Sequence, residues 1–128
     1  MSAPVWPGGT PVAHRTLREA WGIEPEDRWV RLMPDIAADG VWDAAGCGRS
    51  CDELPIPPAL VARIRAWQQC YDAWDGLTGA PRKAEDHPDF PHADFSAEGA
   101  AIAAELRAQL PPDWTVRYHD VTRRVGDD

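Results

Sequence analysis

This sequence lacks long hydrophobic runs and lacks an excess of basic residues. No apolar run approaches the roughly 18 residues that a membrane span needs,. Asp and Glu number 21 against 13 Lys and Arg, which gives a net charge of −8 and a pI of about 4.8. Nucleic acids and anionic membranes both require a basic surface, so we expect neither as a partner. The same charge balance is compatible with a basic protein partner.

Cysteine is also scarce. The three cysteines are an odd number and form no disulfide framework,. The N-terminal stretch MSAPVWPGGTP has neither the basic segment nor the apolar segment of a secretory leader,. We therefore expect a cytoplasmic protein, because thiols stay reduced in that compartment.

Aliphatic residues are few, and tryptophan compensates for them. Leu, Ile, Val and Phe together number 22, about 17% of the chain, a level at which disorder becomes a concern,. Seven Trp residues offset this shortage, since each can bury roughly 150–250 Å²,. A chain of 128 residues can bury about two thirds of its unfolded surface,. We expect one domain over residues 1–128, with an irregular arm at 1–10, a mobile acidic loop at 77–94 and a frayed tail at 122–128.

The strongest periodic signal lies between Pro57 and Asp75, where large apolar residues recur every three or four positions. This spacing predicts a core-facing helix. Prolines suit its first turn, and Gly76 suits the position just past its end. The predicted inner face consists of Leu60, Ile64, Trp67, Tyr71 and Trp74, widened by Val61, Ala62 and Cys70.

Two further helices are indicated. Thr10 and Pro11 resemble the start of a short N-terminal helix that Gly22 would end,. Ser96 resembles the N-cap of a second long helix, with Phe95 as a hydrophobic staple before it,. The inner face expected for that helix consists of Gly99, Ile102, Ala103, Leu106 and Leu110, and two prolines follow it,.

Alternating patterns predict strands at 28–33 and 114–121, and the Val41–Trp42 region could supply a third,. In the first of these strands Val30 and Leu32 face one way, and Trp29, Arg31 and Met33 face the other. The elements together indicate an α/β fold of the α+β type. It would be a small single-layer sheet of two or three strands, covered by two principal helices, plus the short N-terminal helix.

Metal-capable side chains are densest in the loop at 86–94. Asp86, His87, Asp89 and His92 have the right types for zinc or manganese,. The loop is broken by prolines, however, and metal ligands need rigid support. Cys47 and the cysteine four residues later form a CxxxC that lacks the second pair of a zinc site, which leaves a labile disulfide or two free thiols,. We expect no cofactor.

No nucleophile elbow, phosphate loop or other catalytic signature is present. The remaining feature is a set of carboxylates around a tryptophan, formed by Asp35, Asp39, Trp42 and Asp43. Tryptophan flanked by acidic residues is typical of a surface that meets a basic protein. The alternative is that the tryptophan belongs to the core and the aspartates are merely solvated.

Three phrases resemble small bacterial proteins found near polymorphic-toxin immunity genes. The phrases are RLMPD with VWD, LPIP leading into Trp67 and the Tyr71–Asp72 pair, and FSAEG with DWTV. The resemblance covers about residues 30–118 and departs at Ile36, where the pattern has an aromatic residue. It implies no catalytic activity that could be transferred to this chain.

We therefore expect a non-enzymatic cytoplasmic protein-binding domain. An immunity-type inhibitor of a basic toxin would be such a domain. The alternative is a small metal-dependent enzyme that uses the Asp/His-rich loop 86–94. An enzyme should have a concave pocket with converging polar groups, whereas a binding protein should have an exposed aromatic and acidic face.

Overall fold

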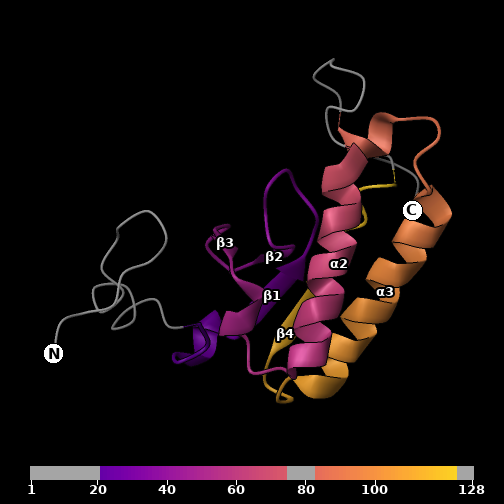
Figure 1. The fold of residues 1–128 in the computed structure, drawn as a ribbon. Coiled ribbons are helices and arrows are strands. Elements are labelled where there is room, and N and C mark those ends of the chain that lie inside the picture. Colours follow the sequence, from indigo (N-terminus) through magenta and orange to yellow (C-terminus); the bar gives the residue numbers. More distant parts are fainter. Residues whose placement is uncertain (1–20, 75–82, 124–128) are drawn as a thin grey trace, which may run out of the picture.

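The computed structural model describes residues 21–74 and 83–123, in which a four-stranded mixed sheet packs against two long helices (Figure 1). The α+β class expected from the sequence is confirmed. The strands are β1 (Trp29–Leu32), β2 (Val41–Trp42), β3 (Gly48–Arg49) and β4 (Thr115–Tyr118). The long helices are α2 (Pro58–Trp74) and α3 (His92–Gln109), and the short 3-10 helices are η1 (Pro25–Asp27), η2 (Cys51–Glu53) and η3 (Ala84–Asp86).

The strand order is β3-β2-β1-β4, with β1 antiparallel to β2 and parallel to β4. Parallel strands need a long crossover, and the chain through α2 and α3 supplies it. The sequence predicted two or three strands. The predicted strand at Val41–Trp42 is confirmed, whereas β3 was missed because a pair of residues carries no alternating pattern.

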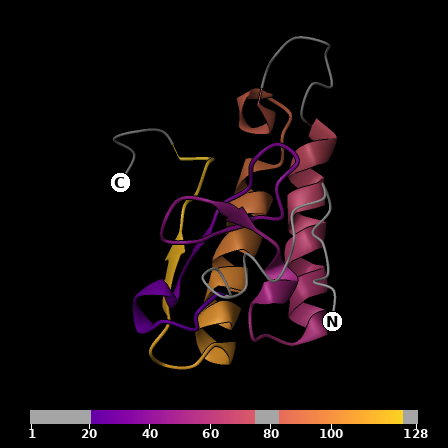
Figure 2. The ribbon, with the colours of Figure 1, turned by 90° about the vertical axis from the view of Figure 1, so that its left-hand side faces the viewer.

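Both long helices cover the same face of the sheet. Figure 2, turned by 90° from Figure 1, shows α2 and α3 side by side. The two helices contact each other, and α3 also contacts β4. Val30 and Leu32 of β1 face the helices and are fully buried. On the other face, Trp29 is partly exposed and Arg31 is exposed. The alternation predicted for this strand is confirmed.

The inner face of α2 agrees with the prediction at most positions. Leu60, Ile64, Trp67 and Tyr71 are buried and Trp74 is partly buried. The prediction for Ala62 and Cys70 was wrong, because both are exposed. Cys70 lines a groove between α2 and α3.

Helix α3 begins at His92, four residues before the predicted cap at Ser96. Phe95 is therefore inside the helix, where its ring stacks on Trp67 at 4.7 Å between centroids. Ser96 donates a hydrogen bond to Asp120 and does not cap the helix. The inner face predicted for this helix is confirmed, since Gly99, Ile102, Ala103, Leu106 and Leu110 are all buried.

Several other predictions concern residues that the structure does not describe: the arm at 1–10, the N-terminal helix before Trp21, Gly76 and most of the tail. In the described part of the 77–94 loop, η3 contacts α2 and Phe90 is buried. No helix in residues 21–74 or 83–123 has both the length and the apolar character needed to cross a membrane.

Candidate functional site

The loop between β1 and β2 contains a tight turn over residues 35–38, and side chains of α2 form hydrogen bonds with the backbone of this turn. The turn closes with a hydrogen bond from Ala38 N to Asp35 O at 3.1 Å. Gln68 of α2 binds both backbone groups of Asp35, accepting from its N–H at 3.2 Å and donating to its carbonyl at 2.6 Å. Asp72, one turn further along α2, accepts from Ala37 N at 3.1 Å and from the Gln68 side chain at 3.0 Å. We call residues 35–38, with Gln68 and Asp72 behind them, the clamped turn.

The clamped turn presents one large apolar side chain to solvent. Ile36 is 51% exposed, and its N–H donates to the Asp35 carboxylate at 2.8 Å. Ala37, the next residue, has a φ of 57°. For a residue with a Cβ this left-handed conformation costs roughly 1–2 kcal/mol, so the hydrogen bond that Ala37 N donates to Asp72 offsets a local strain,. The arrangement holds Ile36 in one position.

Asp39, one of the predicted partner-binding residues, is used inside the molecule. Its carboxylate accepts from Cys51 N at 2.7 Å and from the Arg65 guanidinium at 3.2 Å. Burial alone would raise the pKa of this carboxyl, but the hydrogen bonds from Cys51 and Arg65 outweigh it and hold the pKa below its usual value,. Asp39 thus ties the loop to η2 and α2.

Asp43 also has internal partners. One carboxylate oxygen accepts from Ala45 N and Cys47 N, both at 3.0 Å, and closes the β2–β3 hairpin. The other oxygen accepts from Arg49 at 3.1 Å, and Arg49 also pairs with Glu53 of η2 at 2.9 Å. The Arg49 side chain is only 6% exposed, so this is a largely buried ion-pair network. Asp43 therefore helps fix the β2–β3 hairpin to η2.

Trp42 lies on the sheet face away from the helices and is partly buried there. Its Nε1 donates to Met33 O at 2.8 Å, and its ring covers Gly48 so closely that a Cβ there would meet it at 3.3 Å. Of the four predicted residues, Asp35 belongs to the clamped turn and Trp42 to this open face. Asp39 holds the loop that joins them, and Asp43 holds the hairpin that follows Trp42.

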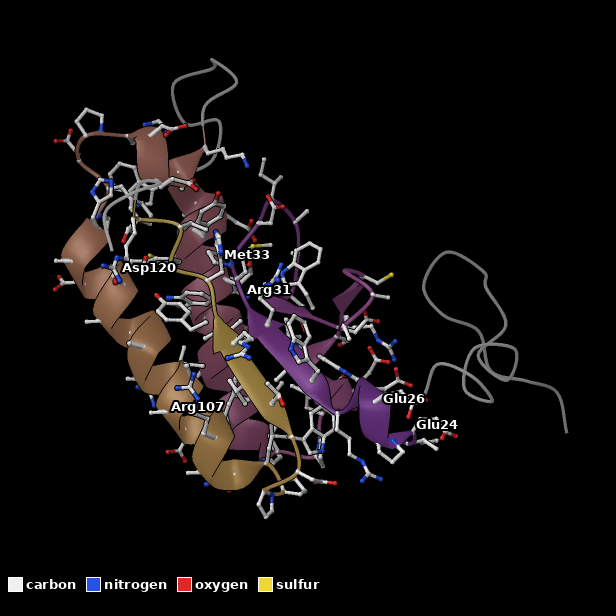
Figure 3. The ribbon with its side chains drawn as sticks, turned by 180° about the vertical axis from the view of Figure 1, so that it is seen from behind. Glu24, Glu26, Arg31, Met33, Arg107 and Asp120 are labelled. Carbon is white, nitrogen blue, oxygen red and sulfur yellow. The ribbon has the colours of Figure 1, made fainter. Side chains whose placement is uncertain are left out.

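The open face of the sheet carries two arginines side by side. Parallel pairing of β1 with β4 places Arg31 opposite Arg117, and antiparallel pairing with β2 places Arg31 opposite Trp42. Both arginines are exposed, and the Arg31 guanidinium lies 5.3 Å from the centre of the Trp29 ring. Figure 3 views the molecule from this side, with Arg31 and Met33 labelled.

We call Trp29, Arg31, Trp42 and Arg117 the arginine face. In residues 21–74 and 83–123 no carboxylate forms an ion pair with either of its arginines. Sequence reasoning placed Arg31 on the opposite side of its strand from Val30 and Leu32 but missed its pairing with Arg117. The sequence does not reveal which strands are neighbours or in which register.

The residues of the predicted metal loop are separated by the fold. His87 is buried against Trp74, with ring centroids 5.7 Å apart, whereas Asp86 and Asp89 are exposed. His92 Nε2 lies 2.8 Å from Glu85 O and donates its proton there, so only the other ring nitrogen of His92 is left to bind a metal,. Among the described residues no three His, Cys, Asp or Glu side chains are grouped closely enough to hold a metal ion.

A small polar hollow lies where the carboxyl ends of β1 and β4 meet α2. Tyr71 donates to Glu85 at 2.7 Å there, and Lys83 and His119 also line it. Its volume is about 200 Å³, below the roughly 300–1,000 Å³ of typical small-molecule sites,. The hollow brings polar groups together, but it is small for a substrate.

A model of a known protein family matches the chain, whereas no curated protein does. The matching family model is described as Serratia CdiI immunity protein-like and covers residues 28–121. This segment includes all four strands, both long helices, the clamped turn and the arginine face. It also contains the segment over which the sequence resembled immunity-associated bacterial proteins, so that prediction is confirmed. The chain belongs to the Serratia CdiI immunity protein-like family.

Proposed function

We propose that this chain is a cytoplasmic immunity protein that neutralises a toxin by binding it, without catalysing a reaction. The observation that carries the proposal is the family match over residues 28–121. The clamped turn supports it, because it gives the fold an exposed element suited to recognition. We propose that this turn, together with Trp42 at the other end of the loop, contacts the toxin.

Three properties of the turn favour binding. Its backbone is fixed by Gln68 and Asp72, so little conformational entropy is lost when a partner binds,. Ile36 offers an apolar side chain that is 51% exposed and would be buried in an interface. Polar groups surround Ile36, and an apolar contact surrounded by polar groups is typical of the residues that contribute most to the free energy of binding.

The charge around the turn supports the proposal that the toxin is basic. Asp35 and Asp72 both lie at the turn, and neither forms an ion pair with a cation in the described part of the chain. The chain as a whole carries a net charge of −8, which would attract a basic protein at long range,. Asp39 would affect binding through the shape of the β1–β2 loop and Asp43 through the shape of the β2–β3 hairpin, since Arg65 and Arg49 already neutralise the two carboxylates.

The test begins with the tagged full chain, used to capture binding proteins from the source lysate for identification by mass spectrometry. Each captured protein is then produced in bacteria with and without this chain. We expect one of them to stop growth alone and to lose that effect when the chain is present. If no captured protein is both toxic and neutralised, the proposed function is wrong.

The turn is tested on that toxin with Ile36→Asp and a matched control. Ile23→Asp changes another exposed isoleucine, 62% exposed, near η1 and outside the clamped turn. We expect Ile36→Asp to raise the Kd at least tenfold and to abolish growth protection, and Ile23→Asp to change the Kd less than twofold. Equal effects of the two variants would show that the turn is not the contact.

The basic character of the toxin is tested with Asp35→Asn. This variant keeps an oxygen that can accept from Ile36 N and removes only the charge,. If the toxin presents a basic patch to the turn, the association rate should fall about twofold to threefold at 0.02 M salt. The difference should disappear at 0.5 M salt, where screening acts within about 4–5 Å. An unchanged rate at low salt would contradict a basic contact at Asp35.

A further inference from the structure

The arginine face is an arrangement that folding alone does not explain. Like charges directly opposite each other in a sheet destabilise it, and β1–β4 pairing places Arg31 next to Arg117,. Neither side chain has an ion-pair partner among the described residues, although the chain has eight more acidic than basic residues. By contrast Arg28, Arg49, Arg63 and Arg65 all pair with carboxylates.

The aromatic residues around the two arginines make this face suitable for binding. The Arg31 guanidinium lies over the Trp29 ring at 5.3 Å, which restricts the side chain and leaves the edge of the guanidinium free to donate hydrogen bonds,. Trp42 sits beside Arg31 in the register and contributes partly exposed ring surface. The face therefore combines two fork-shaped cations with two aromatic rings.

We propose that the arginine face binds an acidic segment of a protein partner, with each guanidinium taking one carboxylate. Arginine and carboxylate match geometrically, because two parallel N–H groups meet two oxygens. The tryptophan rings would cover the apolar stems of the glutamates or aspartates. The identification of that partner as the toxin rests on the proposed function, whereas the preference for carboxylates rests on the face itself.

A nucleic acid would also bring anions, but the observations favour a protein. Binding to DNA or RNA depends on neutralising many phosphates, typically 6–10 for a strong complex. This face offers two arginines, and the net charge of −8 would repel a long polyanion,. Two carboxylates on a short segment match two guanidiniums without that cost.

The first experiment does not require the toxin. The ¹⁵N-labelled full chain is titrated with a blocked eight-residue glutamate peptide, a matched lysine peptide and an eight-nucleotide RNA, and the arginine Nε–H and tryptophan Nε1–H signals are followed by NMR. We expect only the glutamate peptide to shift the signals of Arg31, Arg117 and Trp29 to saturation. The variant Arg31→Gln/Arg117→Gln should weaken this binding at least tenfold.

The matched control is Arg63→Gln, which removes an arginine from the helical side of the molecule, where Arg63 pairs with Glu98. It should leave the affinity for the glutamate peptide within twofold. If the double variant does not fold, as judged by circular dichroism, Arg117→Gln alone serves, with an expected loss of at least threefold. The proposal is overturned if the glutamate peptide causes no saturable shift, if the variants bind it like the wild type, or if RNA binds the same residues more tightly.

The second experiment separates this inference from the proposed function. Once the toxin is captured, its Kd is measured with Arg31→Glu/Arg117→Glu and with Ile36→Asp. Loss of binding in both variants supports the arginine face as part of the toxin interface. Loss in Ile36→Asp alone would leave the immunity function standing and refute the arginine face as a toxin contact.

Discussion

Replacing Trp67 by Ala should bring the protein close to unfolding. Trp67 is 3% exposed, and from α2 its side chain contacts both α3 and β4. Its ring stacks on Phe95 at 4.7 Å with an interplanar angle of 11° and lies 6.3 Å from the Tyr118 ring. Its Nε1 donates to Phe95 O at 3.0 Å. The variant therefore loses a large buried surface, leaves a cavity and removes a donor from a buried carbonyl.

The expected cost is about 3–5 kcal/mol, the usual range for a large aromatic residue replaced by Ala in a core. Domains of this size are stable by only about 5–15 kcal/mol, so a large share of the total is lost. With a urea m-value of about 2 kcal/mol/M, the unfolding midpoint should fall by roughly 1.5–2.5 M. Far-UV circular dichroism in a urea series measures this directly.

Trp67→Phe is the matched variant, because it keeps an aromatic ring against Phe95 and loses the Nε1 donor. A lost hydrogen bond costs about 0.5–1.5 kcal/mol, with a further contribution from the smaller ring. The urea unfolding midpoint of Trp67→Phe should therefore lie between the midpoints of the wild type and Trp67→Ala. A midpoint for Trp67→Ala within about 0.3 M of the wild type would refute the placement of Trp67 at the centre of the core.

Two further predictions concern the attachment of the loop to η2. The pKa of Asp39 is lower in the folded protein than the ordinary carboxyl pKa near 4, because Cys51 and Arg65 donate hydrogen bonds to the ionised carboxylate,. These bonds therefore stabilise the fold fully above about pH 4. The stabilisation is lost as the pH falls through the lowered pKa of the folded protein. Asp39→Asn should thus be less stable than the wild type at pH 7, and the difference in urea midpoint should narrow below about pH 4; a difference that does not depend on pH would contradict this. Burial raises the pKa of the Cys51 thiol to about 12, so a thiol reagent at pH 8 should label exposed Cys47 and Cys70 first and Cys51 only on unfolding,. Equal labelling rates, read by mass spectrometry, would show that Cys51 is accessible.

Helix α2 and the alternation of β1 could be predicted from the sequence because their patterns are local. A period near 3.6 assigns Ile64 and Trp67 to the core, and a period of two separates Val30 and Leu32 from Arg31. The structure shows that Val30 and Leu32 are on the buried side. Cys70 was misassigned because the width of a helix face depends on where its neighbour packs. In this fold α3 leaves a groove beside Cys70, and no local pattern records that.

The candidate site could be predicted only in part, because its contacts join residues far apart in the sequence. The sequence marked Asp39 and Asp43 as acidic loop residues, but their partners Arg65 and Arg49 are determined by tertiary structure. Ile36 stood out only as a departure from a family pattern. Its exposure depends on a turn that α2 holds from 33 residues further along the chain.

In the binding mode that we propose, the two faces of the sheet separate stability from recognition. The inner side of β1 gives Val30 and Leu32 to the core, so changes there should lower stability whatever the partner is,. The outer side of the same strand carries Arg31 next to Arg117, where a change alters charge without opening a cavity. The clamped turn shows the same separation. Gln68 and Asp72 fix its backbone, so the side chain at position 36 can be replaced without breaking these hydrogen bonds. Under the proposed function, substitutions at Ile36 and on the arginine face would change the partner that the protein recognises, while its core stays the same.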